Sequence, residues 1–151
     1  APYCKRIEIA GSIRRGKPEV GDIEIVALPD GNFEVLDIEI VLPGLLPGAD
    51  FIKNGSRYKQ IALPDGINLD LFLVRPPAEW GVIFLLRTGP ADFSRKAVTP
   101  KSKGGLLPSN CRVRDGQVWR NDIDIPMDEE EDFLKLIGLS GLAPEKRKAA
   151  A

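Results

Sequence analysis

The sequence predicts an α/β (α+β) fold in which helices flank a mixed β-sheet and a small second lobe is attached. Short segments that are apolar, or that alternate apolar with polar residues, predict strands; they are residues 5–10, 22–28 and 67–74. Apolar residues at helical spacing predict helices; they occur in residues 78–87, 91–98 and 128–139. Strands interleaved with helices are typical of this fold class.

Length and composition indicate one folded domain with a core. The chain has 151 residues, of which 43% are hydrophobic. Two consecutive prolines, Pro76 and Pro77, interrupt the chain between a strand-rich first part and a mixed second part. We therefore expect residues 1–76 to form the core of the main lobe, and residues 77–151 to complete it and to build the smaller lobe.

The residue inventory excludes several kinds of chemistry. The chain contains no histidine, which excludes histidine-assisted serine and cysteine hydrolases and histidine-based zinc sites. The remaining carboxylate, hydroxyl, lysine and arginine groups suit magnesium-dependent phosphoryl or nucleotidyl transfer. The two cysteines, Cys4 and Cys111, suit a reducing, cytoplasmic compartment. No apolar run is long enough to span a membrane, so we expect no membrane partner.

Charge is unevenly distributed along the chain. The formal net charge is -1, which argues against a general basic coat for nucleic acid. Residues 95–114 nevertheless carry several basic residues and no acid, and form either a phosphate-contacting surface or a solvated loop. The acidic run at 128–132 is interpreted as the first turn of a helix, where the helix dipole favours negative charge.

The first half of the chain is predicted to be mainly β. In chain order, the predicted strands are residues 5–10, 22–28, 51–53, 58–63 and 67–74. Residues 11–21 form a loop between the first two strands, which are expected to pair as neighbours. The apolar residues of 33–42 fit either helical spacing or a strand, and the segment is interpreted as a short helix.

The second half is predicted to be mainly helical. The predicted helices are residues 78–87, 91–98 and 128–139. Asp115-Gly116 marks the turn of a hairpin within residues 112–119. We expect a flexible basic loop at 101–105 and an irregular tail from Gly141 onward.

A functional site is predicted at the second strand. Side chains on a strand alternate between faces, so Asp22 and Glu24 share one face while Ile23 and Ile25 point into a core. Two neighbouring carboxylates repel each other, and a hard divalent cation between them makes the arrangement tolerable. This pair therefore predicts a metal site.

An anion cradle is predicted directly before these carboxylates. The Gly11-Ser12 turn offers backbone N–H groups and a hydroxyl, and Arg15 offers a planar fork of donors. Both features suit phosphate, and an anion cradle beside a cation site suits a metal-bound nucleotide.

Asp70 is the third acid of interest. It shares a strand face with Phe72 in an otherwise apolar segment, where a lone carboxylate is costly unless it is paired or metal-bound. Taken alone, Asp70 is most simply an exposed or ion-paired residue of an edge strand. Beside Asp22 and Glu24, a role as the third metal ligand is favoured.

Four segments, in the same order, resemble the DNA polymerase beta superfamily of nucleotidyltransferases, and family X DNA polymerases most of all. The first is Gly11-Ser12-x-Arg14-Arg15-Gly16 with Gly21-Asp22-Ile23-Glu24-Ile25, and the others are residues 67–74, 80–94 and 125–133. The resemblance implies a nucleotidyltransferase palm with a thumb-like lobe. It also implies transfer of a nucleotide from a nucleoside triphosphate to the 3′ end of a nucleic-acid primer or primer-template.

The resemblance further implies roles for individual residues. The implied catalytic and metal-binding residues are Asp22, Glu24 and Asp70, with Mg²⁺ as cofactor and Mn²⁺ as the alternative. The implied nucleotide-binding residues are Gly11, Ser12, Arg15, Gly21, Thr88 and Gly89. Ser12 and Arg15 are expected to hold the β- and γ-phosphates, and Arg14 to form a structural ion pair.

The chain departs from the family pattern in three respects. Glu24 stands where family X polymerases usually have aspartate, and Leu86-Arg87 stands where an aromatic residue commonly senses the sugar. The resemblance also covers only the palm and thumb. We therefore expect the lyase and fingers segments to be absent and a template to be held weakly.

Two other functions stay open on the sequence alone. One is a nucleotidyltransferase that modifies a protein or a small molecule. The other is a non-catalytic module that binds nucleotides or nucleic acid.

Overall fold

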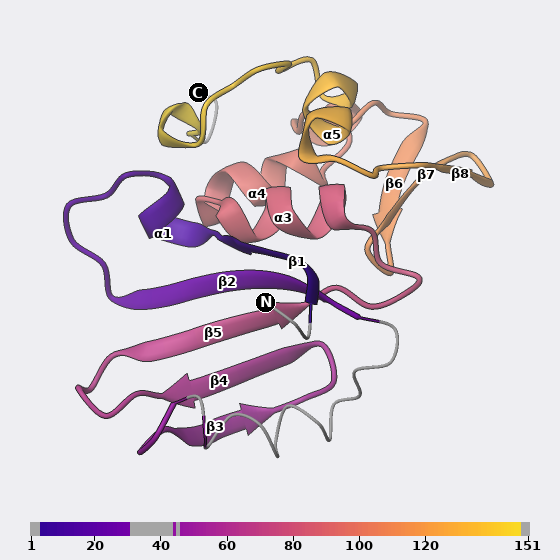
Figure 1. The fold of residues 1–151 in the computed structure, drawn as a ribbon. Coiled ribbons are helices and arrows are strands. Elements are labelled where there is room, and N and C mark those ends of the chain that lie inside the picture. Colours follow the sequence, from indigo (N-terminus) through magenta and orange to yellow (C-terminus); the bar gives the residue numbers. More distant parts are fainter. Residues whose placement is uncertain (1–3, 31–43, 45, 149–151) are drawn as a thin grey trace.

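The computed structural model describes residues 4–30, 44 and 46–148, and its main element is a five-stranded mixed sheet (Figure 1). The strand order is β1-β2-β5-β4-β3. The strands are β1 Cys4–Ile9, β2 Asp22–Pro29, β3 Asp50–Asn54, β4 Tyr58–Ala62 and β5 Asn68–Leu73. The mixed α/β class is confirmed. The five predicted strands are confirmed as well, because each strand begins and ends within one residue of its predicted bounds.

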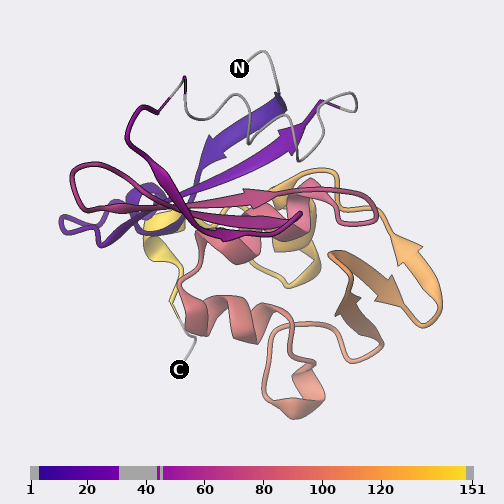
Figure 2. The same ribbon diagram turned by 90° about the horizontal axis from the view of Figure 1, so that it is seen from below.

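Helices gather on one face of this sheet, as the turned view shows (Figure 2). They are α1 Gly11–Arg14, α3 Trp80–Thr88, α4 Ala91–Ala97 and α5 Glu130–Leu136, with 3₁₀ turns η1 Lys101–Lys103 and η2 Pro144–Lys146. A second sheet contains β6 Cys111–Arg114, β7 Gln117–Arg120 and β8 Ile123–Ile125. It lies beyond one end of α3, whereas α1 and the C-terminal turn lie at the other end (Figure 1).

Strand pairing decides which residues become neighbours. β2 pairs antiparallel with β1 and parallel with β5, and β5 pairs antiparallel with β4. The parallel register places Asp22 opposite Asn68, and Glu24 opposite Asp70. Because side chains two residues apart share a face, the three predicted acids lie on the same face of the sheet.

Helix α3 contributes to two buried clusters. Trp80 and Phe84 pack with Val26 of β2 and with Val74, which directly follows β5. The second cluster joins α3 to α4, the small sheet and α5, and includes Val82, Leu85, Phe93, Val118 and Phe133. The residues on both sides of Pro76–Pro77 therefore share the packing of one helix.

Two predictions about the first half need correction. Ile23 and Ile25 are only half-buried, and the buried residues of β2 lie farther along the strand. Val26, on the face of Asp22 and Glu24, packs with α3, and Ala27, on the face of the two isoleucines, packs with Leu73. The predicted loop at 11–21 begins with the helical turn α1. The helix expected at 33–42 lies outside the described residues.

Three predictions about the second half are also wrong in part. The basic segment at 101–105, predicted as a flexible loop, contains the 3₁₀ turn η1. A hydrogen bond from the Lys101 N–H to the Leu107 carbonyl, at 2.7 Å, holds this turn in place. The last long helix spans only Glu130–Leu136. The C-terminal segment includes η2 and the buried Arg147, so it is not an irregular tail. The β6–β7 hairpin is confirmed, and β8 adds a third strand to it.

None of the helices in the described part of the chain combines the length and the apolar character that a membrane span requires.

Candidate functional site

The three predicted acids lie on the neighbouring strands β2 and β5. Asp22 is exposed at the start of β2, Glu24 is half-buried, and Asp70 is 8% exposed. Burial raises the pKa of Glu24; the Ser12 backbone N–H and Arg15 oppose this rise, and the Asp70 and Asp22 carboxylates add to it. The cluster therefore carries unfavourable negative charge that a bound cation offsets.

The chemistry of these donors fits a hard divalent cation, which prefers carboxylate oxygens. The side chains are not gathered around one point, since in the described ranges no three acidic or sulfur side chains form a ready-made metal site. The Glu24 carboxylate instead accepts a hydrogen bond from the Ser12 backbone. Asp22, Glu24 and Asp70 thus place carboxylate oxygens on one sheet face, with the Glu24 carboxylate held by Ser12.

Gly11 allows Glu24 to occupy this position. Its φ is +60°, a conformation that favours glycine, and a Cβ there would lie 1.3 Å from the Glu24 Oε2 atom. The same backbone turn starts α1 and brings the Ser12 N–H to the carboxylate. The observed role of Gly11 and Ser12 is therefore to contact the Glu24 carboxylate closely.

Arg15 lies between this turn and the end of α3. Its Nη1 donates to the Thr88 carbonyl at 2.6 Å, while its buried Nε finds no hydrogen-bond acceptor among the described residues. An unpaired buried donor is costly, so this atom is suited to an anionic ligand. Arg15, Glu24, Phe72, Arg87, Gly89 and Ser94 line a pocket of about 320 Å³ at this place.

The other predicted nucleotide-binding residues have different surroundings. Thr88 is fully buried, and its side-chain and carbonyl oxygens accept bonds from Arg14 and Arg15, so its observed contacts hold the two arginines. Gly89 follows directly and lies close to Arg15, because a Cβ on Gly89 would lie 3.1 Å from the Arg15 Nη1 atom. Gly21 is exposed just before β2, and a Cβ there would meet no neighbour within 4 Å. Nucleotide contacts of these residues stay predictions.

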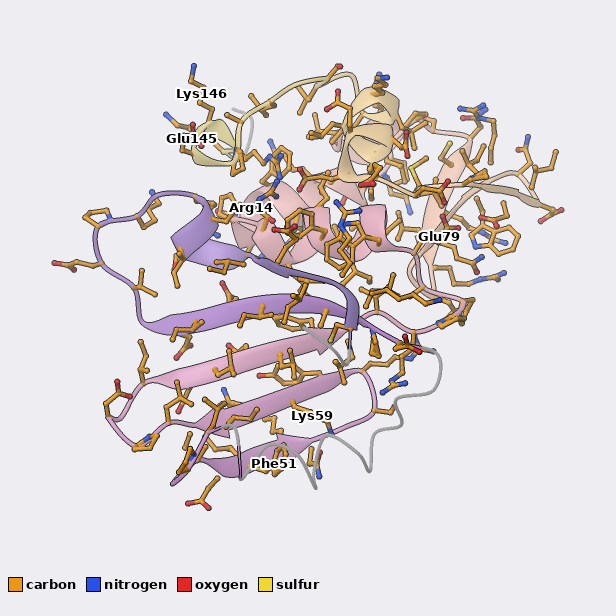
Figure 3. All side chains as sticks on the ribbon, viewed as in Figure 1. Arg14, Phe51, Lys59, Glu79, Glu145 and Lys146 are labelled. Carbon is orange, nitrogen blue, oxygen red and sulfur yellow. The ribbon has the colours of Figure 1, made fainter. Side chains whose placement is uncertain are left out.

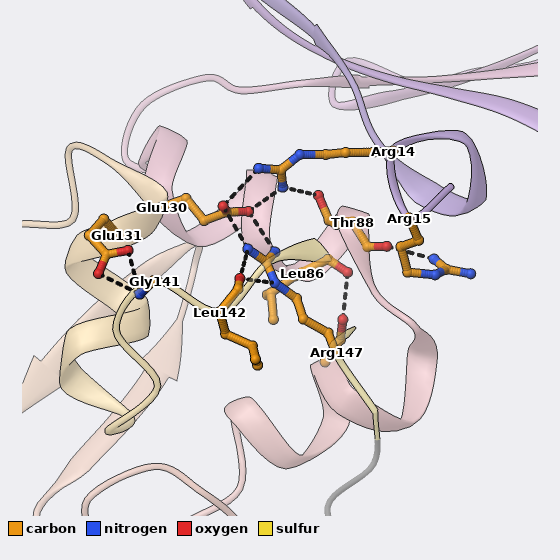
Figure 4. A network of polar contacts seen from close by, with 10 residues as sticks. Arg14, Arg15, Leu86, Thr88, Glu130, Glu131, Gly141, Leu142 and Arg147 are labelled. Atoms are coloured by element: carbon orange, nitrogen blue, oxygen red, sulfur yellow. Dashed lines mark hydrogen bonds and ion pairs between the residues drawn. The ribbon is translucent and has the colours of Figure 1, made fainter. Parts of the chain in front are cut away.

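Arg14 forms the predicted structural ion pair. Its guanidinium binds the buried Glu130 carboxylate through both Nη atoms, and Arg147 binds the same carboxylate at 2.8 and 2.9 Å (Figure 4). Burial alone raises the pKa of Glu130, but the hydrogen bonds from Arg14 and Arg147 outweigh it and lower the pKa to about 2. Glu130, Glu131 and Asp132 lie in the first turn of α5, as expected of the acidic run. The ion pairs of Glu130 with two arginines add a role that the sequence did not predict.

Tyr58 and Gln60 contact Asp70, and the sequence pattern did not single them out. The Tyr58 hydroxyl donates to Asp70 Oδ1 at 2.6 Å, and Gln60 Nε2 donates to the same oxygen at 3.3 Å. Burial, together with the hydrogen bond to Asp70, raises the pKa of Tyr58 to about 12, so the hydroxyl stays protonated as a donor. Both residues lie on one face of β4, and the β4–β5 register brings them to Asp70.

Other charged residues lie outside the site. Arg14 reaches toward the helices, whereas Lys59 and Phe51 lie at the β3–β4 end of the sheet, with Lys59 Nζ 5.4 Å from the Phe51 ring (Figure 3). In the basic stretch, Arg112 and Arg114 are exposed and have acidic neighbours, Asp122 and Asp115, each at 3.8 Å. The positive charge of this stretch is therefore partly compensated by neighbouring carboxylates.

Comparison with models of known protein families finds no match, and comparison with curated protein sequences finds none either.

Proposed function

We propose that this chain is a divalent-metal-dependent nucleotidyltransferase that adds a nucleotide to the 3′ hydroxyl of a nucleic acid, as family X DNA polymerases do. The observation that supports it most is the register of β2 and β5, in which Glu24 lies opposite Asp70 on the face that also carries Asp22. Arg15, with its unpaired buried Nε, lines the adjoining pocket. Acids beside an unsatisfied arginine suit a metal-bound triphosphate.

The proposed reaction is an in-line displacement at the α-phosphorus. The acceptor 3′ oxygen forms a new bond to this phosphorus, and the bond to the oxygen that bridges the α- and β-phosphates breaks. Pyrophosphate leaves with the bonding electron pair, and the hydroxyl proton passes to the Asp70 carboxylate or to water. Arg15 binds the departing phosphates, where its charge stabilises the developing negative charge.

Asp22, Glu24 and Asp70 are the residues that hold the cation in this proposal. When bound, a divalent cation supplies positive charge that offsets the phosphates and favours ionisation of the attacking hydroxyl. The carboxylates position the acceptor and the triphosphate on one sheet face, and the strands keep this face rigid.

The test is extension of a labelled primer, with and without a template strand, in Mg²⁺ and in Mn²⁺, with dNTPs and then rNTPs. Products longer than the primer are expected, and Asp22→Ala abolishes them. Asp65→Ala is the matched control, because Asp65 is an exposed acid in a turn of the same sheet.

Each outcome has a distinct meaning. Extension that requires a template identifies a polymerase, and extension without one identifies a terminal transferase. Saturable nucleotide binding without extension overturns the proposal in favour of a binding module, and labelling of a protein or small molecule alone favours a different acceptor.

A further inference from the structure

A chain of contacts leads from the end of α3 across the sheet to Asp70. The Arg87 guanidinium lies 4.3 Å from the Phe72 ring centroid. Phe72 in turn stacks on Tyr58, with centroids 5.0 Å apart and ring planes 20° apart. Tyr58 then bonds Asp70 through its hydroxyl. This packing fixes the ring, and therefore the place of the hydroxyl.

Strand register explains why Tyr58 reaches Asp70. Tyr58 pairs with Phe72 and Gln60 pairs with Asp70 across the antiparallel β4–β5 ladder. Tyr58 is therefore the diagonal neighbour of Asp70 on the same face, within reach of an aromatic side chain. Its bond of 2.6 Å has the length of a charge-assisted hydrogen bond from a hydroxyl to a carboxylate.

Both hydrogen bonds to Asp70 reach one oxygen. Tyr58 and Gln60 donate to Oδ1, and in the described part of the chain no hydrogen bond reaches Oδ2. A carboxylate held by one oxygen keeps the other available as a ligand, and such outer partners orient metal ligands in proteins.

We propose that Tyr58 is a positioning residue for Asp70, holding Oδ1 so that Oδ2 is available to a bound divalent cation. The inference rests on the proposed function, because it assigns Asp70 to the metal site. Tyr58 itself touches neither the nucleotide nor the acceptor. Its effect is transmitted through the orientation of the carboxylate.

The test is Tyr58→Phe, which removes the hydroxyl and keeps the ring that stacks on Phe72. Mn²⁺ affinity is measured by the electron paramagnetic resonance signal of the free ion, and transfer is measured as kcat and KM. Loss of an outer partner weakens metal binding or activity by about 10–100-fold. We expect Mn²⁺ affinity and kcat to fall in that range, with the KM for the nucleotide little changed.

Thr99→Val is the matched control. It removes a hydroxyl between α4 and η1 that donates to the Arg95 carbonyl at 2.6 Å. Mn²⁺ affinity and kcat are expected to match the parent chain. The thermal midpoint of each variant, measured alongside, separates a loss of folding from a loss of metal binding, because a purely structural role of Tyr58 changes the midpoint and leaves Mn²⁺ affinity intact.

The two proposals fail in different ways. Unchanged Mn²⁺ affinity and kcat in Tyr58→Phe overturn the role of Tyr58 and leave the nucleotidyltransferase proposal standing. A parent chain that binds Mn²⁺ with an affinity dependent on Tyr58, yet transfers no nucleotide, supports the positioning role and overturns the proposed function. A parent chain that binds no Mn²⁺ overturns the role of Tyr58.

Discussion

At the scale of single residues, two polar groups lie in surroundings that their neighbours only partly satisfy. Arg15 has a buried Nε without an acceptor among the described residues, and Asp70 has one carboxylate oxygen bonded twice. Buried polar atoms are normally paired, so the Arg15 Nε atom is a candidate for a ligand contact. The Asp70 Oδ2 atom accepts no hydrogen bond from the described residues, so it is a second candidate. Substitution of each residue tests this reading.

Asp70→Ala is expected to lower the rate of nucleotide transfer by at least about 100-fold, a loss comparable to that of one group which stabilises a transition state. The affinity for the nucleoside triphosphate stays nearly unchanged, because Asp70 acts on the acceptor side. Single-turnover extension and equilibrium nucleotide binding measure the two effects. Asp65→Ala is the control and is expected to keep the parent rate. A parent rate in Asp70→Ala contradicts a role of Asp70 in the reaction.

Arg15→Ala is expected to weaken triphosphate binding by about 10–100-fold, the loss of a hydrogen bond to a charged group. Arg15→Lys keeps the positive charge but lacks the planar guanidinium, so its affinity for the triphosphate is expected to lie between those of the parent and of Arg15→Ala. Fluorescence titration with a nucleotide measures the dissociation constants. Arg120→Ala removes an exposed arginine on β7 and serves as control. Equal dissociation constants for parent and Arg15→Ala contradict the assignment.

At the scale of elements, a buried ion cluster joins three segments that are distant in sequence. Glu130 at the start of α5 binds Arg14 of α1 and Arg147 after η2. Arg147 is 3% exposed and also donates to the Leu142 carbonyl at 3.0 Å. Arg14 in turn donates to the Thr88 side chain at 2.7 Å, so the cluster reaches the residue that holds Arg15.

Glu130→Gln is expected to destabilise the folded chain by about 3 kcal/mol, since removing one partner leaves buried charge uncompensated. For a domain of this length, that loss lowers the thermal midpoint by about 6–12 °C. Differential scanning calorimetry at pH 7 measures it. Asp128→Asn, at an exposed acid just before the helix, is expected to change the midpoint little.

The same cluster predicts a dependence of stability on pH. The folded pKa of Glu130 is about 2, below its ordinary value of 4.5. A lowered acid pKa contributes stability that is complete above the unfolded pKa and is lost as pH falls through the folded pKa. The difference in unfolding free energy between the parent and Glu130→Gln is therefore expected to shrink from pH 4.5 toward pH 2. Urea unfolding at about pH 7, 4 and 3 tests this, and a constant difference contradicts it.

At the scale of the whole molecule, α3 connects the main sheet to α4, α5 and the three-stranded sheet. Trp80 and Phe84 pack on the sheet, while Val82 and Leu85 pack toward α4 and α5. Gly81 permits a close approach of this helix to the segment before α5, because a Cβ there would lie 2.3 Å from the Glu129 carbonyl oxygen. One shared helix couples the packing of the two parts.

We therefore expect one cooperative unfolding transition. The chain has two tryptophans, Trp80 in the cluster on the main sheet and Trp119 on β7 of the three-stranded sheet. In Trp119→Phe the fluorescence reports on the surroundings of Trp80, and in Trp80→Phe it reports on the surroundings of Trp119. In each variant the fluorescence midpoint is expected to coincide with that of far-UV circular dichroism. Separate midpoints indicate that the main sheet and the three-stranded sheet unfold independently.

The sequence alone determined the parts of this protein that depend on local order. Alternation and turn residues located five strands, the hairpin at Asp115-Gly116 and the helices around Thr88-Gly89-Pro90. They also placed Asp22 and Glu24 on one face, because side-chain direction on a strand follows position in the chain. Ile23 and Ile25 are less buried than expected, because the buried residues of β2 lie farther along the strand, with Val26 on one face and Ala27 on the other.

Only the tertiary structure decided the contacts between distant segments. It paired β2 with β5, which put Glu24 opposite Asp70, and β4 with β5, which brought Tyr58 to the same carboxylate. It also buried Glu130 between two arginines from opposite ends of the chain. Strand register and ion pairing of this kind arise from the packing of complete elements, which no local pattern of residues specifies.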